Sequence, residues 1–398
     1  GGLLHDFGAM PESRAAFERA LESAVANEQR AQAWLGLAAV KRVTDDVDGA
    51  FADLDRAAAA TEGNPLSEQR ARIHFLRGNL HFPRGDIAGC LSEHRKSLEI
   101  AQQVGSVELE AQALGGLGDA EYIRGRMISA HRHLKRCVDL AAEHGFGRIE
   151  VANRCQVAHT ILYFRPLSEA LAQGVAAAKA AAEVGHLRAE INGRVASIFA
   201  LFTMTDLGRL REQAALVLDL VERLGARRFL QSCLLYLGKA ALWDGDRPNA
   251  VRLREVLEIS HQTGIGFHGP NILGALALAV TDPSEARQAL AEGESLMRHG
   301  SVGHNPLRFY PDAIDVSLAL GDWDEADRYV DALDRFTRPE PLPWSDFFIA
   351  RGRTLAALGR GRRTEQIRRE LERLSDQARS LDYYSALPAI EQALNGFA

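Results

Sequence analysis

The residues most able to do chemistry in this sequence are its thirteen histidines, and their spacing argues against a metal site. A local group is formed by His131, His133 and His144. On one helix, residues two apart point to different faces, so His131 and His133 cannot share a metal ion. We therefore expect surface histidines here and no metal site.

Segments that could bind phosphate or a nucleotide are explained better in other ways. Gly238 and Lys239 form a Gly-Lys pair, but alanine follows and the upstream glycine of a phosphate-binding loop is missing. The glycine-rich residues 115–125 follow no strand, as a dinucleotide site would require. Carboxylate pairs such as Asp322 and Asp324 fall at turns, where they cap the following helix. The sequence predicts no catalytic residue and no cofactor.

Composition excludes other classes of protein. The 398 residues carry a net charge of −6, which argues against a nucleic-acid partner. The most basic stretch, residues 360–373, alternates with glutamate as a solvated helix face does. No apolar run is long enough to span a membrane and no secretory signal opens the chain, so we expect a cytoplasmic location. The scattered Cys90, Cys137, Cys155 and Cys233 are expected in the core.

Glycines recur at regular intervals along the chain and indicate where its helices end. They are Gly63, Gly105, Gly145, Gly185, Gly225, Gly264 and Gly300, with successive gaps of 42, 40, 40, 40, 39 and 36 residues. Each follows an apolar stretch with helical periodicity, and glycine ends helices because it adopts positive φ freely. A fixed period of roughly 20 to 50 residues indicates units repeated in tandem.

Turn signals about halfway between these glycines divide each unit into two helices. They stand at Gly85-Asp86, Gly125-Arg126, Arg165-Pro166, Thr205-Asp206, Gly245-Asp246, Asp282-Pro283, Gly321-Asp322 and Gly359-Arg360. Between turns, apolar residues recur with helical spacing, as in Leu210, Ala214 and Val217, and no stretch alternates as a strand would. The pattern predicts an all-α fold of about nine helix-turn-helix repeats with a period near 40 residues.

One repeat array is expected to span residues 1–398 as a single module, because each unit packs only on its neighbours. Residues 1–63 form N-terminal repeats, 64–300 the regular repeats, and 301–398 irregular repeats with proline-rich loops and capping helices. The first helix, from Glu12 to about residue 26, is typical of the second helix of a unit. We therefore expect a fragment of a longer polypeptide.

Several units resemble the tetratricopeptide repeat. Residues 77–82 read RGNLHF and lead to a turn at Gly85-Asp86, and the next unit has Leu117-Gly118 and then Tyr122. A later unit repeats this with Leu237-Gly238, Trp243 and Gly245-Asp246. The period is longer than the usual 34 residues of this family, and some units lack the Leu-Gly pair. The resemblance implies a right-handed superhelical solenoid.

The longer period is similar to that of repeats at the C-terminal end of large bacterial signalling proteins. In these proteins a class III adenylate or guanylate cyclase and an ATPase-like domain precede the repeats, or a STAND ATPase does. Residues 75–147 are most similar to the cyclase-linked group. This resemblance implies a regulatory arm joined to such an effector.

In such repeats the first helix of each unit lines a concave groove that holds partners. Matching the sequence to the repeat's pattern places these residues in the groove: Arg72, Phe75, Asn79, Phe82, Gln112, Asp119, Tyr122, His159, Asn192, Phe199, Lys239, Asn271 and Arg308. Asparagine, arginine and lysine can hold a peptide backbone or a terminal carboxylate, and aromatic rings supply apolar anchors. Aromatic residues such as Phe82 and Phe199 also fit the core between repeats.

Two proline-containing segments, residues 300–311 and 337–344, interrupt the regularity. Because proline ends helices, we expect both to stand off the array as a lid over the groove, a contact to a preceding domain or a plain connector.

Two functions fit these patterns. The first is a non-catalytic sensor or interaction module that binds a peptide, a protein, adjoining domains of its own polypeptide or a small ligand. The second is a constitutive scaffold or oligomerisation module without a ligand of its own.

Overall fold

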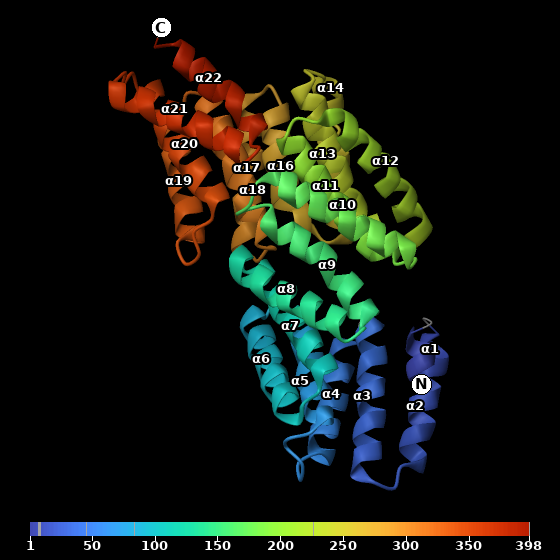
Figure 1. Cartoon of the computed structure of the whole chain (residues 1–398). Coiled ribbons are helices and arrows are strands. Elements are labelled where there is room, and N and C mark those ends of the chain that lie inside the picture. The colour runs from blue at the N-terminus through green and yellow to red at the C-terminus, as the bar shows by residue number, and fades with distance from the viewer. Residues whose placement is uncertain (7–8, 45, 83, 226, 398) are drawn as a thin grey trace. The chain divides into compact units, whose positions relative to one another are not determined.

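The structure is a computed structural model that describes residues 1–6, 9–44, 46–82, 84–225 and 227–397. Throughout these ranges the chain is helical and no β-strand occurs (Figure 1). Short turns join successive helices, as the apolar periodicity predicts. The expected all-α, tetratricopeptide-like solenoid is confirmed.

In chain order the helices are α1 (Gly2–Asp6), α2 (Met10–Ser23), α3 (Asn27–Val43), α4 (Val47–Ala60), α5 (Glu68–His81), α6 (Ile87–Val104), α7 (Val107–Ile123), α8 (Met127–Glu143), α9 (Gly147–Ile161), α10 (Leu167–Glu183), α11 (Leu187–Thr203), α12 (Leu207–Leu224), the 3-10 turn η1 (Arg227–Phe229), α13 (Leu230–Trp243), α14 (Arg247–Ala250), α15 (Leu253–Thr263), α16 (Ile265–Ala279), α17 (Pro283–Arg298), α18 (His304–Ala319), α19 (Trp323–Thr337), α20 (Pro343–Gly359), α21 (Glu365–Ser380), the 3-10 turn η2 (Tyr384–Ala386) and α22 (Leu387–Asn395).

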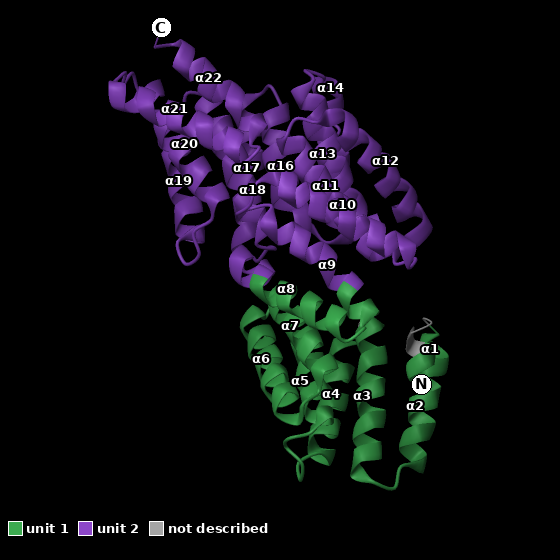
Figure 2. Ribbon diagram, in the orientation of Figure 1, with its two compact units in different colours: residues 1–121, 132–150 green, residues 122–131, 151–398 purple. Residues whose placement is uncertain are grey.

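The chain forms two compact units (Figure 2). Unit 1 comprises residues 1–121 and 132–150, and unit 2 comprises residues 122–131 and 151–398. In unit 1, α3 packs on α4 and α5 packs on α6. In unit 2, most consecutive helices from α10 to α22 pack on one another, and α11, α13, α16, α18 and α20 also pack on one another in that order. We call this second series the inner helices of unit 2.

Aspartates and glycines mark the turns, as the sequence predicts. The side chains of Asp86, Asp206 and Asp246 each accept a hydrogen bond from the backbone N–H three residues later, which caps the following helix. Gly105 and Gly225 end α6 and α12 with φ angles of 70° and 68°. Glycine adopts this left-handed conformation without the steric cost that a side chain brings.

Two glycines do not have the roles predicted for them. Gly63 does not end a helix directly, because α4 ends at Ala60 and Thr61 forms its C-cap. Gly359 is the last residue of α20 rather than a turn residue. A Cβ at Gly359 would lie 2.5 Å from the ring of Trp323, so this glycine serves helix packing, and Gly361 with φ of 84° makes the turn.

The Leu-Gly pairs bring helices close together. A Cβ at Gly118 would lie 2.4 Å from Cγ of Leu134, and one at Gly238 would lie 2.7 Å from Cδ2 of Leu253. A side chain at either glycine would collide with a leucine of the paired helix, so one of the two would have to shift. The free cysteines are buried, as expected for small core residues: Cys90, Cys137, Cys155 and Cys233.

The expectation that residues 300–311 stand off the array is wrong, because α18 begins within them and runs through Pro306 and Pro311. Pro306 lies in the first turn, where a backbone N–H has no partner within the helix. Pro311 cannot donate to the carbonyl of Leu307 four residues earlier. The indole Nε1 of Trp344 donates to that carbonyl instead, at 2.7 Å.

A second internal proline has the same effect in α16. Pro270 leaves the carbonyl of Gly266 without its helical donor. That carbonyl accepts hydrogen bonds from the backbone N–H of Val302, at 3.2 Å, and from Nδ2 of Asn305, at 3.1 Å. Both prolines therefore allow hydrogen bonds between helices, and these bonds hold α18 between α16 and α20.

Residues 337–344 do not stand off the array either. The carboxylate of Glu340 accepts hydrogen bonds from the backbone N–H groups of Ile128, at 2.8 Å, and Ser129, at 3.1 Å. Leu342 is fully buried. The segment is therefore a packed connector that caps the first turn of α8, where the helix dipole favours a negative charge.

A row of polar side chains, three of them buried and the last partly buried, crosses unit 2. Oγ of Ser232 lies 2.5 Å from Nε2 of His268, whose Nδ1 lies 3.2 Å from Nε2 of His304. The other ring nitrogen of His304 lies 3.2 Å from the hydroxyl of Tyr122. Burial lowers the pKa of His268 to about 3 and that of His304 well below its usual value, with nearby Arg308 adding to both shifts. These imidazoles are therefore neutral at pH 7.

We predict that a Thr205→Gly substitution stabilises unit 2. Thr205 adopts φ of 60° in the turn before α12, where a β-branched residue is strained and the equivalent turn before α14 has Gly245. Removal of this strain should raise the free energy of unfolding by about 0.5–1 kcal/mol, measured by urea denaturation. The matched reverse change, Gly245→Thr, should lower the free energy of unfolding. A Cβ at Gly245 would meet no neighbouring atom, so the positive φ of the backbone is the source of the strain. A lower urea midpoint for Thr205→Gly would contradict this assignment of strain.

Stability should fall as the pH is lowered from 7 to 5. Burial lowers the pKa of His94 and His159 to about 4 and that of His268 to about 3, whereas an unfolded histidine titrates near 6.5. Below about pH 6.5 the unfolded chain therefore binds protons that the folded chain does not, and each histidine costs about 1.4 kcal/mol per pH unit. Urea midpoints at pH 7, 6 and 5 measure the loss. The exposed His144→Gln variant should show the same slope, and equal midpoints at all three pH values would show that these histidines do not stay neutral.

Candidate ligand-binding cavity

A cavity of about 350 Å³ opens on the inner helices of unit 2. Side chains from α11, α13, α16, α18 and α20 line it, and residues Ser385 and Ala386 of η2 contribute to its rim. Neighbouring residues on the lining follow helical spacing, since Arg308, Asp312 and Asp315 stand four and three residues apart on α18. The repeat thus brings one face of each inner helix to a common site.

Arg308 is the most unusual residue of this cavity. Its side chain is 6% exposed, and its Nε donates to the hydroxyl of Tyr163 at 2.8 Å. The guanidinium carbon lies 4.2 Å from the ring centroid of Phe199 and 6.0 Å from that of Tyr236. Aromatic faces stabilise a cation but do not neutralise it. Among the described residues, no carboxylate forms an ion pair with Arg308.

The other charges of the cavity are paired. Nζ of Lys239 lies 2.6 Å and 2.8 Å from the two carboxylate oxygens of Asp312. Burial raises the pKa of Asp312, and the charge of Lys239 opposes that shift. Asp315 pairs with Arg351 at 2.5 Å.

An aromatic wall faces these polar groups. The ring of Trp344 lies 5.4 Å from that of Phe199 and 4.6 Å from that of Phe348. Tyr383, which comes directly before η2, is fully buried with its ring 5.1 Å from Trp344. Such rings supply a large apolar contact area with little loss of conformational entropy.

The C-terminal segment is held against α10 at the edge of this wall. The backbone N–H of Leu167 donates to the carbonyl of Leu381 at 3.2 Å, and that of Ser168 donates to Oδ2 of Asp382 at 2.9 Å. These bonds position η2, which follows directly, at the rim of the cavity.

The Ser232–His268 pair has the geometry of a nucleophile and base, but its surroundings do not suit catalysis. Both residues are buried and neither lines the cavity. The lowered pKa of His268 makes its imidazole a weak proton acceptor, and its other nitrogen faces the neutral His304 rather than a carboxylate. The pair therefore ties α13 to α16 and α18.

The structure brings three of the predicted groove residues together, since Phe199, Lys239 and Arg308 all line the cavity. Nε2 of His159 bonds to the carbonyl of Asn192 at 3.0 Å, so these two tie α9 to α11.

Tyr122 is partly buried, and Asn271 is buried on the inner helix α16. Tyr122 meets His304, as described above. Asn271 is 2% exposed, and neither atom of its side-chain amide has a hydrogen-bond partner among the described residues. It stands seven residues before Leu278 of the cavity lining, on the same face of α16.

The other predicted groove residues lie in unit 1. They are Arg72, Phe75, Asn79 and Phe82 of the α5 region, and Gln112 and Asp119 of α7. Phe75 packs on the ring of His94 at 5.6 Å, and Phe82 is 43% exposed at the end of α5. Nε2 of Gln112 bonds within its own helix to Glu108. Their role in binding stays a prediction.

Sequence reasoning missed several residues of the cavity. Tyr236 precedes Lys239 by three residues, and Asp312 follows Arg308 by four, so helical spacing from the predicted residues could have found both. Trp344 of the lining, and Tyr163, whose hydroxyl accepts a hydrogen bond from Arg308, could not be found in this way. They reach the site through contacts between α20, α18 and the end of α9, which no local pattern encodes.

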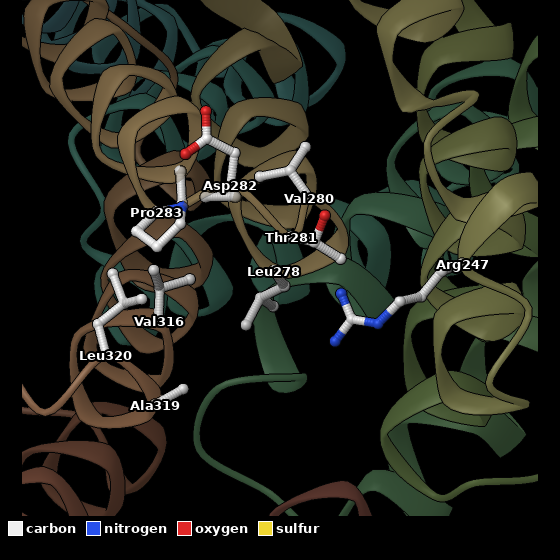
Figure 3. Close-up of a pocket in the computed structure, with 11 residues that line it drawn as sticks. Arg247, Leu278, Val280, Thr281, Asp282, Pro283, Val316, Ala319 and Leu320 are labelled. Atoms are coloured by element: carbon white, nitrogen blue, oxygen red, sulfur yellow. The ribbon is translucent and has the colours of Figure 1, made fainter.

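A smaller cavity of about 260 Å³ lies beside the turn between α16 and α17 (Figure 3). Its charged side chains, Arg247 and Asp282, already have structural roles, and Thr281 is exposed. Arg247 donates to the carbonyl of Ala279 at the end of α16, and Asp282 caps α17 by accepting from Ser284 N–H. The two charged side chains of this cavity are therefore already used within the fold.

Within the described part of the chain, no group of three or more histidine, cysteine or acidic residues is placed to hold a metal ion. No helix among the described residues is both long and apolar enough to cross a membrane.

Comparisons with known proteins agree with the fold. The family model of the tetratricopeptide repeat matches residues 69–143. Comparison with curated protein sequences gives no match. A Rap protein complexed with competence and sporulation factor is similar in structure with a TM-score of 0.60 and 11% identity, covering 93% of this chain and 98% of that one.

Two further solved structures are similar. The apo form of RapI has a TM-score of 0.57 and 11% identity, over 81% of this chain and 92% of that one. NprR in complex with its cognate peptide NprX has a TM-score of 0.54 and 14% identity, over 88% and 98%. At these identities the likeness concerns the fold, and the chain is a tetratricopeptide-like α-solenoid.

Proposed function

We propose that this chain is a non-catalytic regulatory module that binds a peptide, or a segment of a protein partner, in the cavity of unit 2. The observation that carries the proposal is the cavity itself, where an unneutralised buried arginine faces an aromatic wall. Two proteins of similar fold support a peptide occupant: the Rap protein was solved with competence and sporulation factor, and NprR with its peptide NprX.

The dimensions and chemistry of the cavity suit a ligand of a few residues. Its volume of about 350 Å³ falls within the range of ligand sites, and most of its lining is apolar or aromatic with a few polar groups. Because every inner helix contributes side chains, a bound ligand would contact several repeats at once. A ligand that fits one arrangement of these repeats better than another would shift the equilibrium between them.

The wider context of the module follows from the resemblance of residues 75–147. We place it in the cytoplasm as the regulatory arm of a bacterial signalling protein that carries a cyclase or a STAND ATPase. A constitutive scaffold or oligomerisation module is the alternative, and it needs no ligand.

The test compares wild-type chain with a variant whose cavity is filled. Ser385→Trp adds an indole at the rim, where Ser385 is partly exposed and lines the cavity. We expect wild type to retain members of a pool of random pentapeptides in affinity selection read by mass spectrometry. Ser385→Trp should weaken their binding by at least about 10-fold, a change of about 1.4 kcal/mol.

Ser380→Trp, on the exposed end of α21, is the matched control and should bind as wild type does. The unit 1 pair Arg72→Ala with Asn79→Ala tests the other predicted groove residues. If wild type retains no peptide but sediments as a stable oligomer, the scaffold alternative is correct. If the Arg72 and Asn79 changes abolish binding and Ser385→Trp does not, the site lies in unit 1.

A further inference from the structure

We propose that the cavity of unit 2 recognises a carboxylate of its ligand, and that Arg308 is the residue that selects it. The inference rests on the proposed peptide-binding function and adds the chemical group that the ligand must carry. It starts from a side chain that is more than nine-tenths buried, lines the cavity and has no anionic partner among the described residues.

The partners of Arg308 among the described residues are tyrosine hydroxyls and aromatic rings, and none of them is an anion. Nε donates to the hydroxyl of Tyr163, and the hydroxyl of Tyr236 also faces the group. The described residues supply neither a carboxylate nor a backbone carbonyl to Nη1 or Nη2. Two parallel N–H donors at the end of a guanidinium match the two oxygens of a carboxylate.

The balance of charge around Arg308 favours an anion with a single charge. Lys239 is neutralised by Asp312, and Arg351 by Asp315. The histidines that the charge of Arg308 influences, His159, His268 and His304, are neutral because burial lowers their pKa values. One positive charge is therefore left over, and a carboxylate cancels it. A phosphate dianion would leave one negative charge in a buried site.

The aromatic wall favours an apolar ligand residue next to the carboxylate. Phe199 stacks on the guanidinium, and Trp344 and Phe348 continue the wall beyond it. An apolar residue next to the carboxylate would cover these rings and exclude water from the ion pair. The carboxylate can belong to the C-terminus of a peptide or to an Asp or Glu side chain, and the experiment separates these sources.

The experiment uses four pools of N-acetylated pentapeptides and the full chain. The first has free C-terminal carboxylates and no acidic side chain; the second is amidated with one Asp or Glu. The third is amidated and uncharged, and the fourth is amidated with one phosphoserine. We expect wild type to retain the first or second pool at least 10-fold better than the third and fourth, which also identifies the source of the carboxylate.

Arg308→Met removes the charge and keeps an apolar chain of similar length, and it should lower retention of the preferred pool by at least about 30-fold. Arg308→Lys keeps the charge without the planar pair of donors, so it should retain the preference more weakly than wild type. Arg353→Met, on the exposed face of the same unit, should change nothing. Circular dichroism and urea midpoints show whether each variant folds. If Arg308→Met does not fold, the inference is tested by Arg308→Lys and by the comparison of the four pools with wild type.

The outcomes separate this inference from the proposed function. If wild type retains the uncharged pool as well as the acidic ones, or Arg308→Met keeps the preference, peptide binding stands and carboxylate selection is wrong. Retention of the phosphoserine pool alone also overturns it. If no pool is retained, both the proposed function and the inference fail.

Discussion

Unit 2 is organised around the positive charge of Arg308, which is buried without a carboxylate partner among the described residues. Removing a charge from water costs several kcal/mol unless other groups compensate. Here the compensation is partial: a tyrosine hydroxyl on one edge and aromatic faces above. An anion would supply the remaining part. This incomplete compensation is the reason for which we propose an anionic ligand.

The helix that carries Arg308 is held by unusual means. Prolines in α16 and α18 each leave one carbonyl without its helical donor, and groups from neighbouring helices donate to both carbonyls. The indole that bonds to the Leu307 carbonyl belongs to Trp344, which also lines the cavity. The position of α18 and the shape of the site are therefore coupled through one side chain. A ligand that moved Trp344 would also alter the packing of α18 on α20.

Much of the fold follows from local signals in the sequence. The period of about 40 residues, the Asp caps and glycines such as Gly105 and Gly225 predicted helix pairs correctly, because each depends on a few adjacent residues. The sequence pattern gives the wrong expectation for residues 300–311 because a helix can keep an internal proline when a distant donor such as Trp344 bonds to the free carbonyl. For residues 337–344 the expectation is wrong because Glu340 accepts hydrogen bonds from the distant residues Ile128 and Ser129. The resemblance to the repeat predicted Phe199, Lys239 and Arg308 as groove residues. It could not predict that Arg308 has no carboxylate partner among the described residues or that it bonds to Tyr163, because both depend on tertiary packing.

The most direct measurement is a crystal structure of the full chain with a bound peptide from the retained acidic pool. Carboxylate recognition predicts both oxygens of one ligand carboxylate within about 2.7–2.9 Å of Nη1 and Nη2 of Arg308, with an apolar ligand side chain against Trp344. A peptide seated on α5 and α7 of unit 1 would contradict it. So would a peptide in the cavity whose carboxylates all point away from Arg308.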